Sequence, residues 1–215
     1  MRENVIKAIE QEKIIAIIRG ADTEQAVKAS KAIYDGGIKL VEVTFNQKEP
    51  ESFIQTVNTI KAIKSACPEM IVGAGTVLNI EQVDLALSAG AEYIVSPDAD
   101  EKVIEYSVKN GLVSLPGAYT ATEVKKAHQA GADFIKLFPC IDGAVGYLKA
   151  LKAPLSHIKF LAVGGVTVDN AKDFIKAGAV GIGVGGALIN KKLLDAGEYE
   201  KITLLAQKFV QSVKD

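Results

Sequence analysis

Short apolar runs alternate with amphipathic stretches along the whole chain. One phrase recurs with variation: a helix-like stretch ends in a glycine and an apolar run follows, as in "QAGADFIKL" from Gln129 and "KAGAVGIGV" from Lys176. Glycine readily takes the left-handed conformation that ends a helix, and an apolar run of this length fits a strand buried on both faces. The glycines of the five copies are Gly37, Gly90, Gly111, Gly131 and Gly178. Helix-to-strand units repeating at so short an interval predict parallel strands.

Counting the apolar runs that lack this phrase gives eight predicted strands. They cover residues 14–18, 39–44, 70–73, 93–96, 112–115, 134–138, 160–163 and 180–184, and amphipathic helices fill the gaps, among them 23–35, 49–66 and 80–89. Eight such units, with an extra helix before the first, predict a single-domain (β/α)8 TIM barrel over residues 1–215. An open doubly wound sheet has a similar periodicity, but its glycine loop follows the first strand, whereas here glycine pairs follow the last two.

The composition narrows the range of partners. The chain is 48% hydrophobic with a net charge of -1, and its basic residues are scattered along predicted helices. That pattern indicates solvated helix faces, so we expect no nucleic-acid partner. An acidic or phosphorylated small molecule is still compatible with this charge distribution, because one or two well-placed groups are enough to bind it. The N-terminal stretch lacks the apolar core of a signal peptide, and no apolar run reaches membrane-spanning length. We therefore expect a cytoplasmic protein without a membrane partner.

Cysteines and histidines are scarce. Cys67 and Cys140 are the only cysteines, which is too few for a disulfide framework and agrees with a reducing compartment. His128 and His157 are the only histidines, and neither has a neighbour at metal-ligand spacing. We expect no metal site, and both histidines are predicted on surface helices or loops.

A lysine interrupts one of the apolar runs. In "DFIKLFP", from Asp133, strand alternation puts Phe134, Lys136 and Phe138 on one face and the two aliphatic residues between them on the other. Lys136 is then buried inside the barrel. A buried ammonium is costly to desolvate, so such a lysine is usually paired, neutralised or used for chemistry.

A carboxylate occupies the equivalent place on another strand. In "KLVEVTFN" the same alternation puts Leu40, Glu42 and Thr44 on the interior face and the apolar residues toward the helices. Two interpretations stay open for Glu42 and Lys136. They could form a buried structural ion pair, or they could be a Schiff-base lysine and its proton-transfer partner. The second is favoured because perturbed pairs of this kind gather at functional sites.

Other candidates follow strand ends, where the active site of such a barrel lies. Thr76, in "VGAGTVLN", follows a strand end rich in glycine and could bind a carboxylate or carbonyl oxygen; alternatively it caps the following helix. Arg19 ends the first strand and could hold an anion through its fork of donors, or simply face solvent. The pairs Gly164-Gly165 and Gly185-Gly186 end the last two strands, where barrels commonly bind phosphate through backbone N–H groups.

The motifs taken together resemble one family, the 2-keto-3-deoxy-6-phosphogluconate (KDPG) and 4-hydroxy-2-oxoglutarate (KHG) aldolases, which are class I pyruvate-dependent lyases. The resemblance covers essentially the whole chain, and its motifs, in order, are "GGIKLVEVTF", "IVGAGTVLN", "YIVSP", "LPGAYTATEV", "FIKLFP" and "VGGVT".

The resemblance implies roles for the candidate residues. Lys136 is then the imine-forming lysine and Glu42 the general acid and base, while Thr76, Pro116 and Phe138 shape the pyruvate pocket. The glycine pairs and Arg19 are expected to hold the distal phosphate or carboxylate. The resemblance also implies a homotrimer and a reaction that needs no cofactor, since Lys136 supplies the electron sink.

Three positions depart from the common family pattern. Asn46 stands where many members have an arginine that helps to hold the pyruvate carboxylate, a role that Arg19 could take over. Val163 replaces a threonine that contacts the substrate hydroxyl, as in the branch acting on the galactonate epimer. Ala187 replaces a phosphate-binding serine, which leaves backbone N–H groups as donors. These changes leave the catalytic pair intact and bear on the choice of substrate.

The predicted function is reversible cleavage of a 2-keto-4-hydroxy acid, such as the phosphorylated keto-deoxy sugar acid or 4-hydroxy-2-oxoglutarate, to pyruvate and an aldehyde. Two alternatives remain open at this point. One is a phosphate-binding barrel isomerase or epimerase, in which Glu42 alone abstracts a proton and Lys136 is an electrostatic clamp. The other is a barrel that binds a sugar-acid phosphate without turning it over.

Overall fold

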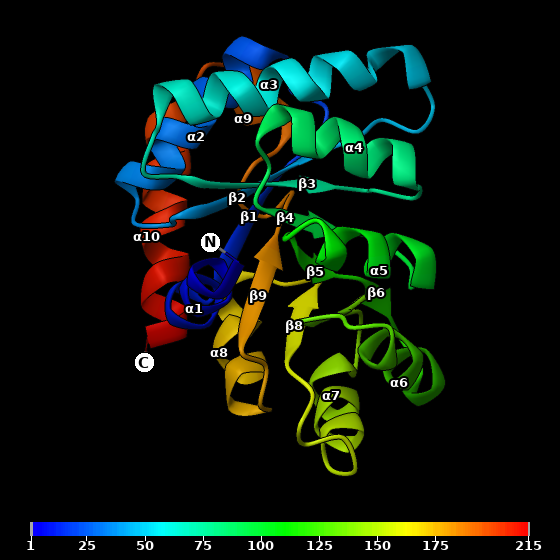
Figure 1. Ribbon diagram of the computed structural model, residues 1–215. Helices are drawn as coiled ribbons and strands as arrows, with labels where there is room; N and C mark the ends of the chain where they lie inside the picture. The colour runs from blue at the N-terminus through cyan, green and yellow to red at the C-terminus, as the bar shows by residue number, and fades with distance from the viewer. Residues whose placement is uncertain (1, 215) are drawn as a thin grey trace.

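All the strands of the computed structural model, which describes residues 2–214, run parallel in one sheet that curls into a barrel (Figure 1). Their order in the sheet is β5-β4-β3-β2-β1-β9-β8-β7-β6. The strands are β1 (Ile14–Ile18), β2 (Leu40–Thr44), β3 (Ile71–Gly75), β4 (Tyr93–Val95), β5 (Val113–Leu115), β6 (Gly117–Ala118), β7 (Ile135–Leu137), β8 (Phe160–Val163) and β9 (Gly181–Val184). The predicted (β/α)8 architecture is confirmed.

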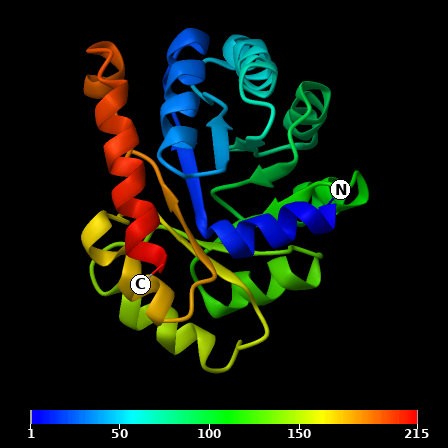
Figure 2. The ribbon, with the colours of Figure 1, turned by 90° about the vertical axis from the view of Figure 1, so that its left-hand side faces the viewer.

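Helices follow the strands and cover the outside of the sheet. They are α1 (Arg2–Glu12), α2 (Thr23–Asp35), α3 (Phe53–Ala66), α4 (Ile80–Ala89), α5 (Glu101–Lys109), α6 (Ala121–Gln129), α7 (Ala144–Lys152), α8 (Val168–Lys176), α9 (Lys191–Asp195) and α10 (Tyr199–Lys214), with the 3₁₀ turn η1 (Pro50–Ser52) before α3. Figure 2 shows α10 beside α2, and α10 packs on α8 as well, so it closes the ring of helices. None of the helices described within residues 2–214 is long and apolar enough to cross a membrane.

A proline divides the strand that closes the barrel. β5 pairs with β4 and β6 pairs with β7, and only Pro116 separates β5 from β6. Proline has no N–H to give to a neighbouring strand, but its carbonyl still accepts a bond from the Lys136 N–H at 2.9 Å. β5 and β6 are therefore two halves of one strand, and the eight predicted strands account for the nine segments.

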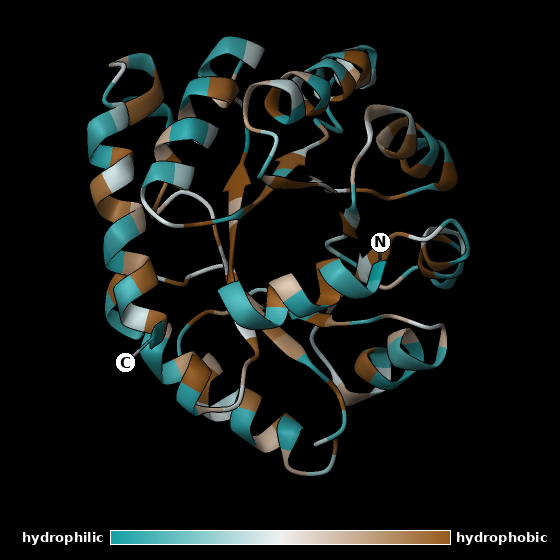
Figure 3. Ribbon diagram, turned by 60° about the vertical axis from the view of Figure 1, so that its left-hand side comes forward, coloured by the Kyte–Doolittle hydropathy of each residue, from teal (hydrophilic) through white to brown (hydrophobic). Residues whose placement is uncertain are grey.

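The core has two layers because both faces of the sheet are buried. Side chains on the outer face, such as Val41 and Ile135, pack against the helices, and those on the inner face, such as Leu40 and Phe134, fill the barrel. The apolar stripe of α1, which includes Ile9, packs onto this inner layer and closes the N-terminal end of the barrel. Figure 3 shows α1 lying across the ring of strands and helices. The opposite end, where the strands finish, is left for a site.

The recurring glycines act as the sequence predicts. All five have positive φ, and Gly90, at 80°, is the left-handed cap of α4, its N–H donating to carbonyls of the last turn. Left-handed backbone strains any other residue, so glycine here ends each helix and turns the chain into the next strand. This turn sets which residues of the strand face the barrel interior.

Candidate active site

Lys136 and Glu42 both lie inside the barrel, as alternation predicts. Lys136 is the middle residue of β7 and is 7% exposed, and Glu42 is the middle residue of β2 and is 3% exposed. Their strand neighbours Phe134 and Leu40 belong to the inner layer of the core. Two ionisable groups from different strands thus project into the same apolar barrel interior.

A cavity of about 550 Å³ opens above these two residues at the C-terminal end of the barrel. Of the residues predicted for the site, the cavity is lined by Arg19, Glu42, Thr76, Lys136, Phe138, Gly164, Gly165, Gly185 and Gly186. Pro116 does not line it; its carbonyl instead fixes the backbone of Lys136. The cavity is of the size that small-molecule sites usually have.

Burial shifts the pKa of both groups toward their neutral forms. It raises the pKa of Glu42, and the positive charges of Lys136 and Arg19 oppose the shift only in part. It likewise lowers the pKa of Lys136 from 10.5; the Glu42 carboxylate counteracts this, and Arg19 adds to it. Both shifts favour the forms that the chemistry needs, because a neutral amine attacks a carbonyl and a neutral carboxyl group can donate a proton.

The two groups do not form a structural ion pair. Among the described residues 2–214, the pairs with nitrogen and oxygen within 4.0 Å do not include Lys136 with Glu42. The Lys136 ammonium nitrogen lies 4.7 Å from the centre of the Phe138 ring instead. The interpretation as a buried salt bridge therefore has no contact to support it, and both groups face the cavity.

Glycines on β3 make room for the carboxylate. Gly75 faces the barrel interior beside β2, and a methyl group on its Cα would collide with the Glu42 carboxylate oxygen. Gly73, directly opposite Glu42 in the register, is covered by the ring of Tyr93. The Glu42 carboxylate thus lies beside Gly75, toward the end of the barrel where the cavity lies.

Replacing Gly75 by alanine tests this steric argument. The added methyl group would overlap the Glu42 carboxylate oxygen, so the carboxylate must move from its position facing the cavity. We expect Gly75→Ala to lower kcat by roughly tenfold or more, as a misplaced acid–base group does, with far-UV circular dichroism unchanged. Gly146→Ala is the matched control, since its methyl group would meet no atom within 4 Å. Wild-type kcat in Gly75→Ala would contradict the placement of Glu42.

Thr76 and Arg19 meet at the rim of the cavity. The guanidinium of Arg19 donates a hydrogen bond to the Thr76 hydroxyl oxygen at 3.1 Å. The alternative that Thr76 caps the next helix is wrong, because α4 is capped by Asn79, whose side chain accepts a bond from the Gln82 N–H. Thr76 therefore does not cap α4, and it lines the cavity together with Arg19.

The glycine pairs lie at the other strand ends of the cavity. Gly164 and Gly165 both have left-handed backbone, with φ of 83° and 86°. A methyl group on Gly165 would also collide with the Cys140 carbonyl oxygen, so only glycine fits there. A methyl group on Gly185 would make only ordinary contact with Ile17, and one on Gly186 would meet no atom within 4 Å. The two pairs leave backbone bare of side chains along this side of the cavity.

The family of the chain follows from comparison with known proteins. Residues 5–205 match the model of the KDPG and KHG aldolase family. The chain belongs to this family of aldolases. The resemblance seen in the motifs is thereby confirmed, and with it the prediction of an aldolase.

Relatives with established names agree with this assignment. The chain is 39% identical, over 81% of its length and 83% of the relative, to 2-dehydro-3-deoxy-6-phosphogalactonate aldolase of Escherichia coli strain K12. It is 32% identical, over 94% of its length and 92% of the relative, to the KHG/KDPG aldolase of the same strain. A solved structure of native KDPGal superposes with a TM-score of 0.84 at 36% identity, covering 94% of each chain.

The cavity of this aldolase-family chain includes residues that the sequence did not single out. They are Ile17, Pro97, Val166, Thr167 and Gly183, and the cavity is also lined by two of the positions that depart from the family pattern, Val163 and Ala187. Asn46, the third variant position, is exposed and lines a separate hollow with Thr44 and Ser52. A polar residue just after a glycine pair was the available signal for Thr167, whereas Pro97 comes from a loop whose place depends on how the barrel closes.

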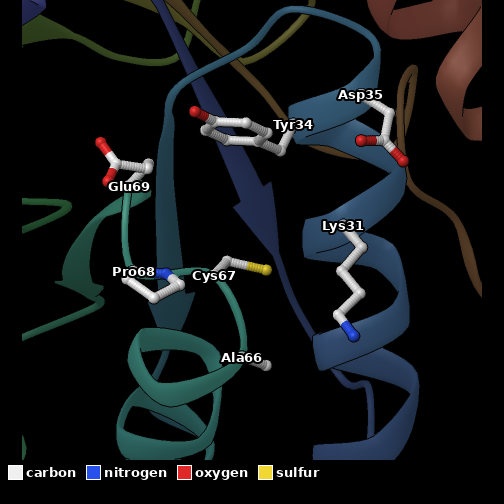
Figure 4. Close-up of a pocket in the computed structure, with 7 residues that line it drawn as sticks. All are labelled: Lys31, Tyr34, Asp35, Ala66, Cys67, Pro68 and Glu69. Carbon is white, nitrogen blue, oxygen red and sulfur yellow. The ribbon is translucent and has the colours of Figure 1, made fainter.

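A second cavity, of about 290 Å³, lies away from the catalytic end of the aldolase barrel. Figure 4 shows it between the end of α2, which carries Lys31 and Tyr34, and the turn after α3, which carries Cys67. Burial raises the pKa of the Cys67 thiol, which keeps it protonated and unreactive. This cavity offers no pair of groups suited to covalent chemistry.

Proposed function

We propose that Lys136 forms a Schiff base with a 2-keto-4-hydroxy acid and that Glu42 transfers the protons of its cleavage to pyruvate and an aldehyde. The observation that carries this proposal is the pair itself: a buried amine with a lowered pKa and a buried carboxyl with a raised pKa, facing one cavity without an ion pair. Family membership supports it, because aldolases of this family are named for such substrates.

The steps follow from the states of these two groups. Neutral Lys136 attacks the C2 ketone to give a carbinolamine, which takes up a proton from solvent water and loses its hydroxyl group as water to leave a protonated imine. The Glu42 carboxylate takes the proton of the C4 hydroxyl, the C3–C4 bond breaks, and its electrons move into the imine to give an enamine. After the aldehyde leaves, Glu42 returns the proton to C3, and water releases pyruvate and the free amine.

The cavity provides binding groups at both ends of such a substrate. Arg19 and Thr76, which are hydrogen-bonded to each other, are suited to the carboxylate next to the reacting ketone. Phe138 supplies an apolar wall beside the Lys136 amine. The bare backbone of the pairs Gly164-Gly165 and Gly185-Gly186 is suited to a distal phosphate, whose charge also favours the N-terminal end of α8 nearby.

The substrate is the phosphorylated 2-keto-3-deoxy sugar acid, and Val163 and Ala187 bear on which epimer is used. Val163 places an apolar surface in the cavity where a hydroxyl is common in the family, and the 39% identical relative is named for the galactonate epimer. Pyruvate release from the gluconate-derived phosphate, the galactonate-derived phosphate and 4-hydroxy-2-oxoglutarate, measured side by side, tests the proposal. Pyruvate from none of the three, with folded protein, would refute it.

The charges around Lys136 predict that two substitutions shift the pH dependence of imine formation in opposite directions. Imine formation needs the neutral amine, so the rate of borohydride trapping at saturating pyruvate rises with pH through the pKa of Lys136. Since the Glu42 carboxylate raises that pKa and Arg19 lowers it, Glu42→Gln shifts the midpoint to lower pH and Arg19→Gln to higher pH. Shifts in the same direction for both variants would contradict this arrangement of charges.

We also propose a homotrimer and a cytoplasmic location, on the ground of the family resemblance. Two exposed apolar side chains, Tyr119 and Ile141, follow the neighbouring strands β6 and β7, and Ile141 is 65% exposed. Surface of this kind is suited to contact between subunits. Light scattering gives the mass directly, and a monomer at micromolar concentration would contradict the trimer.

A further inference from the structure

Thr76 has a backbone conformation that threonine disfavours. Its φ is 57°, in the left-handed region, where Cβ crowds the neighbouring carbonyl oxygen and a β-branched residue is rare. Conformations of this kind persist where surrounding contacts fix them, and they gather at functional sites. Because Thr76 lines the cavity, the contacts that hold its backbone also set the position of its side chain toward a bound ligand.

Two hydrogen bonds hold the segment of chain just after Thr76 in place. The Val77 carbonyl accepts a hydrogen bond from the Ser96 hydroxyl at 2.7 Å. The Leu78 N–H donates to the side-chain oxygen of Gln82 at 2.7 Å, and the Gln82 side chain is fully buried. These two bonds anchor the loop between β3 and α4 to the body of the barrel, but neither acts on Thr76 itself.

A hydrogen bond to the backbone of Thr76 comes from another loop. The side-chain amide of Gln47, on the segment after β2, donates to the Thr76 carbonyl oxygen at 2.6 Å. The buried amide of Gln82 in turn donates to the Gln47 side-chain oxygen at 3.1 Å. Gln82, Gln47 and Thr76 therefore form a relay of hydrogen bonds that runs from α4 to the rim of the cavity.

We propose that Gln47 is a positioning residue that acts on substrate binding through Thr76. By holding the Thr76 carbonyl, it fixes the left-handed backbone and hence the direction of the Thr76 hydroxyl. Arg19 already donates to that hydroxyl oxygen, so the hydroxyl proton is left to donate to an anion in the cavity. This inference rests on the proposed function, in which Arg19 and Thr76 bind the carboxylate of the pyruvate unit.

The test uses the pyruvate concentration that gives half-maximal borohydride trapping. In Gln47→Leu the relay is cut, and we expect this concentration to rise roughly threefold to tenfold, as loss of one ordinary hydrogen bond predicts, with little change in the maximal rate. Gln47→Glu keeps an oxygen for Gln82 but has no N–H for Thr76, so the same rise is expected. Lys48→Leu, on the same loop but outside the relay, should match the wild type.

A double-mutant cycle shows whether the effect passes through Thr76. In the Thr76→Ala background the hydroxyl is absent, so adding Gln47→Leu should change the half-saturating concentration no further. A wild-type value in Gln47→Leu, or the same fold-increase with and without the Thr76 hydroxyl, would overturn the proposal.

Amide hydrogen exchange tests the relay without any turnover. The segment 76–79 should exchange faster in Gln47→Leu and Gln47→Glu than in the wild type or Lys48→Leu. Unchanged exchange would contradict the positioning role. If the wild type itself trapped no pyruvate while exchange changed as expected, the proposed function would fail and the relay would stand.

Discussion

Replacing Lys136 by alanine abolishes pyruvate release, with a loss of kcat on the order of 10⁴-fold or more, because no other group in the cavity can form the imine. The fold survives the change. Burial raises the pKa of Glu42 and the charge of Lys136 opposes that shift, so removing Lys136 raises this pKa further and favours the neutral carboxyl group over an unpaired buried charge. Pyruvate release coupled to lactate dehydrogenase measures the loss, and a melting curve checks the fold.

Two further lysine variants sharpen this result. Lys136→Arg keeps a positive charge but has no amine that can be neutral, so it should be as inactive as Lys136→Ala. Lys159→Ala is the matched control, because Lys159 pairs with Glu10 at the surface and is 43% exposed. Turnover in Lys136→Arg would show that Lys136 acts only through its charge, as in the isomerase alternative.

Replacing Glu42 by glutamine is the second large effect that we expect. The amide keeps the shape of the side chain but can neither take nor return a proton at the reacting carbons. Removing a positioned acid–base group slows catalysis by roughly 10²–10⁴-fold, and kcat should fall by that factor. Borohydride trapping with pyruvate should continue, since Lys136 remains.

The control for Glu42 is another carboxylate of the same barrel. Glu92 pairs with Lys64 at 2.7 Å just before β4, and Glu92→Gln should leave kcat unchanged. An unaffected kcat in Glu42→Gln would reduce Glu42 to a packing partner. A loss of trapping together with turnover would assign Glu42 to imine formation instead of cleavage.

The fold could be predicted from the sequence because apolar runs and cap glycines repeat at regular intervals. Deviations arise where residues give little hydrophobic signal. The third strand was predicted over 70–73, whereas β3 extends to Gly75, because glycines pair along a ladder without any side chain to mark it. The short strand β6 was not predicted, since Pro116 interrupts the pattern although the chain stays extended through it.

The candidate site could be predicted where strand alternation alone decides which way a side chain points. Lys136 and Glu42 are such cases, and the structure puts both inside the barrel. The left-handed backbone of Thr76 and its bond from Gln47 could not be predicted, because they depend on where two loops from different strands meet. Pro97, which lines the cavity from a loop, escaped prediction for the same reason.

The central claim is that Lys136 forms a covalent imine with the keto acid. The most direct measurement is to incubate the protein with pyruvate, reduce it with borohydride, and locate the modified lysine by mass spectrometry of its peptides. We predict a single reduced adduct on Lys136 that is absent from Lys136→Ala. No adduct in folded wild-type protein, or an adduct on another lysine, would contradict the claim.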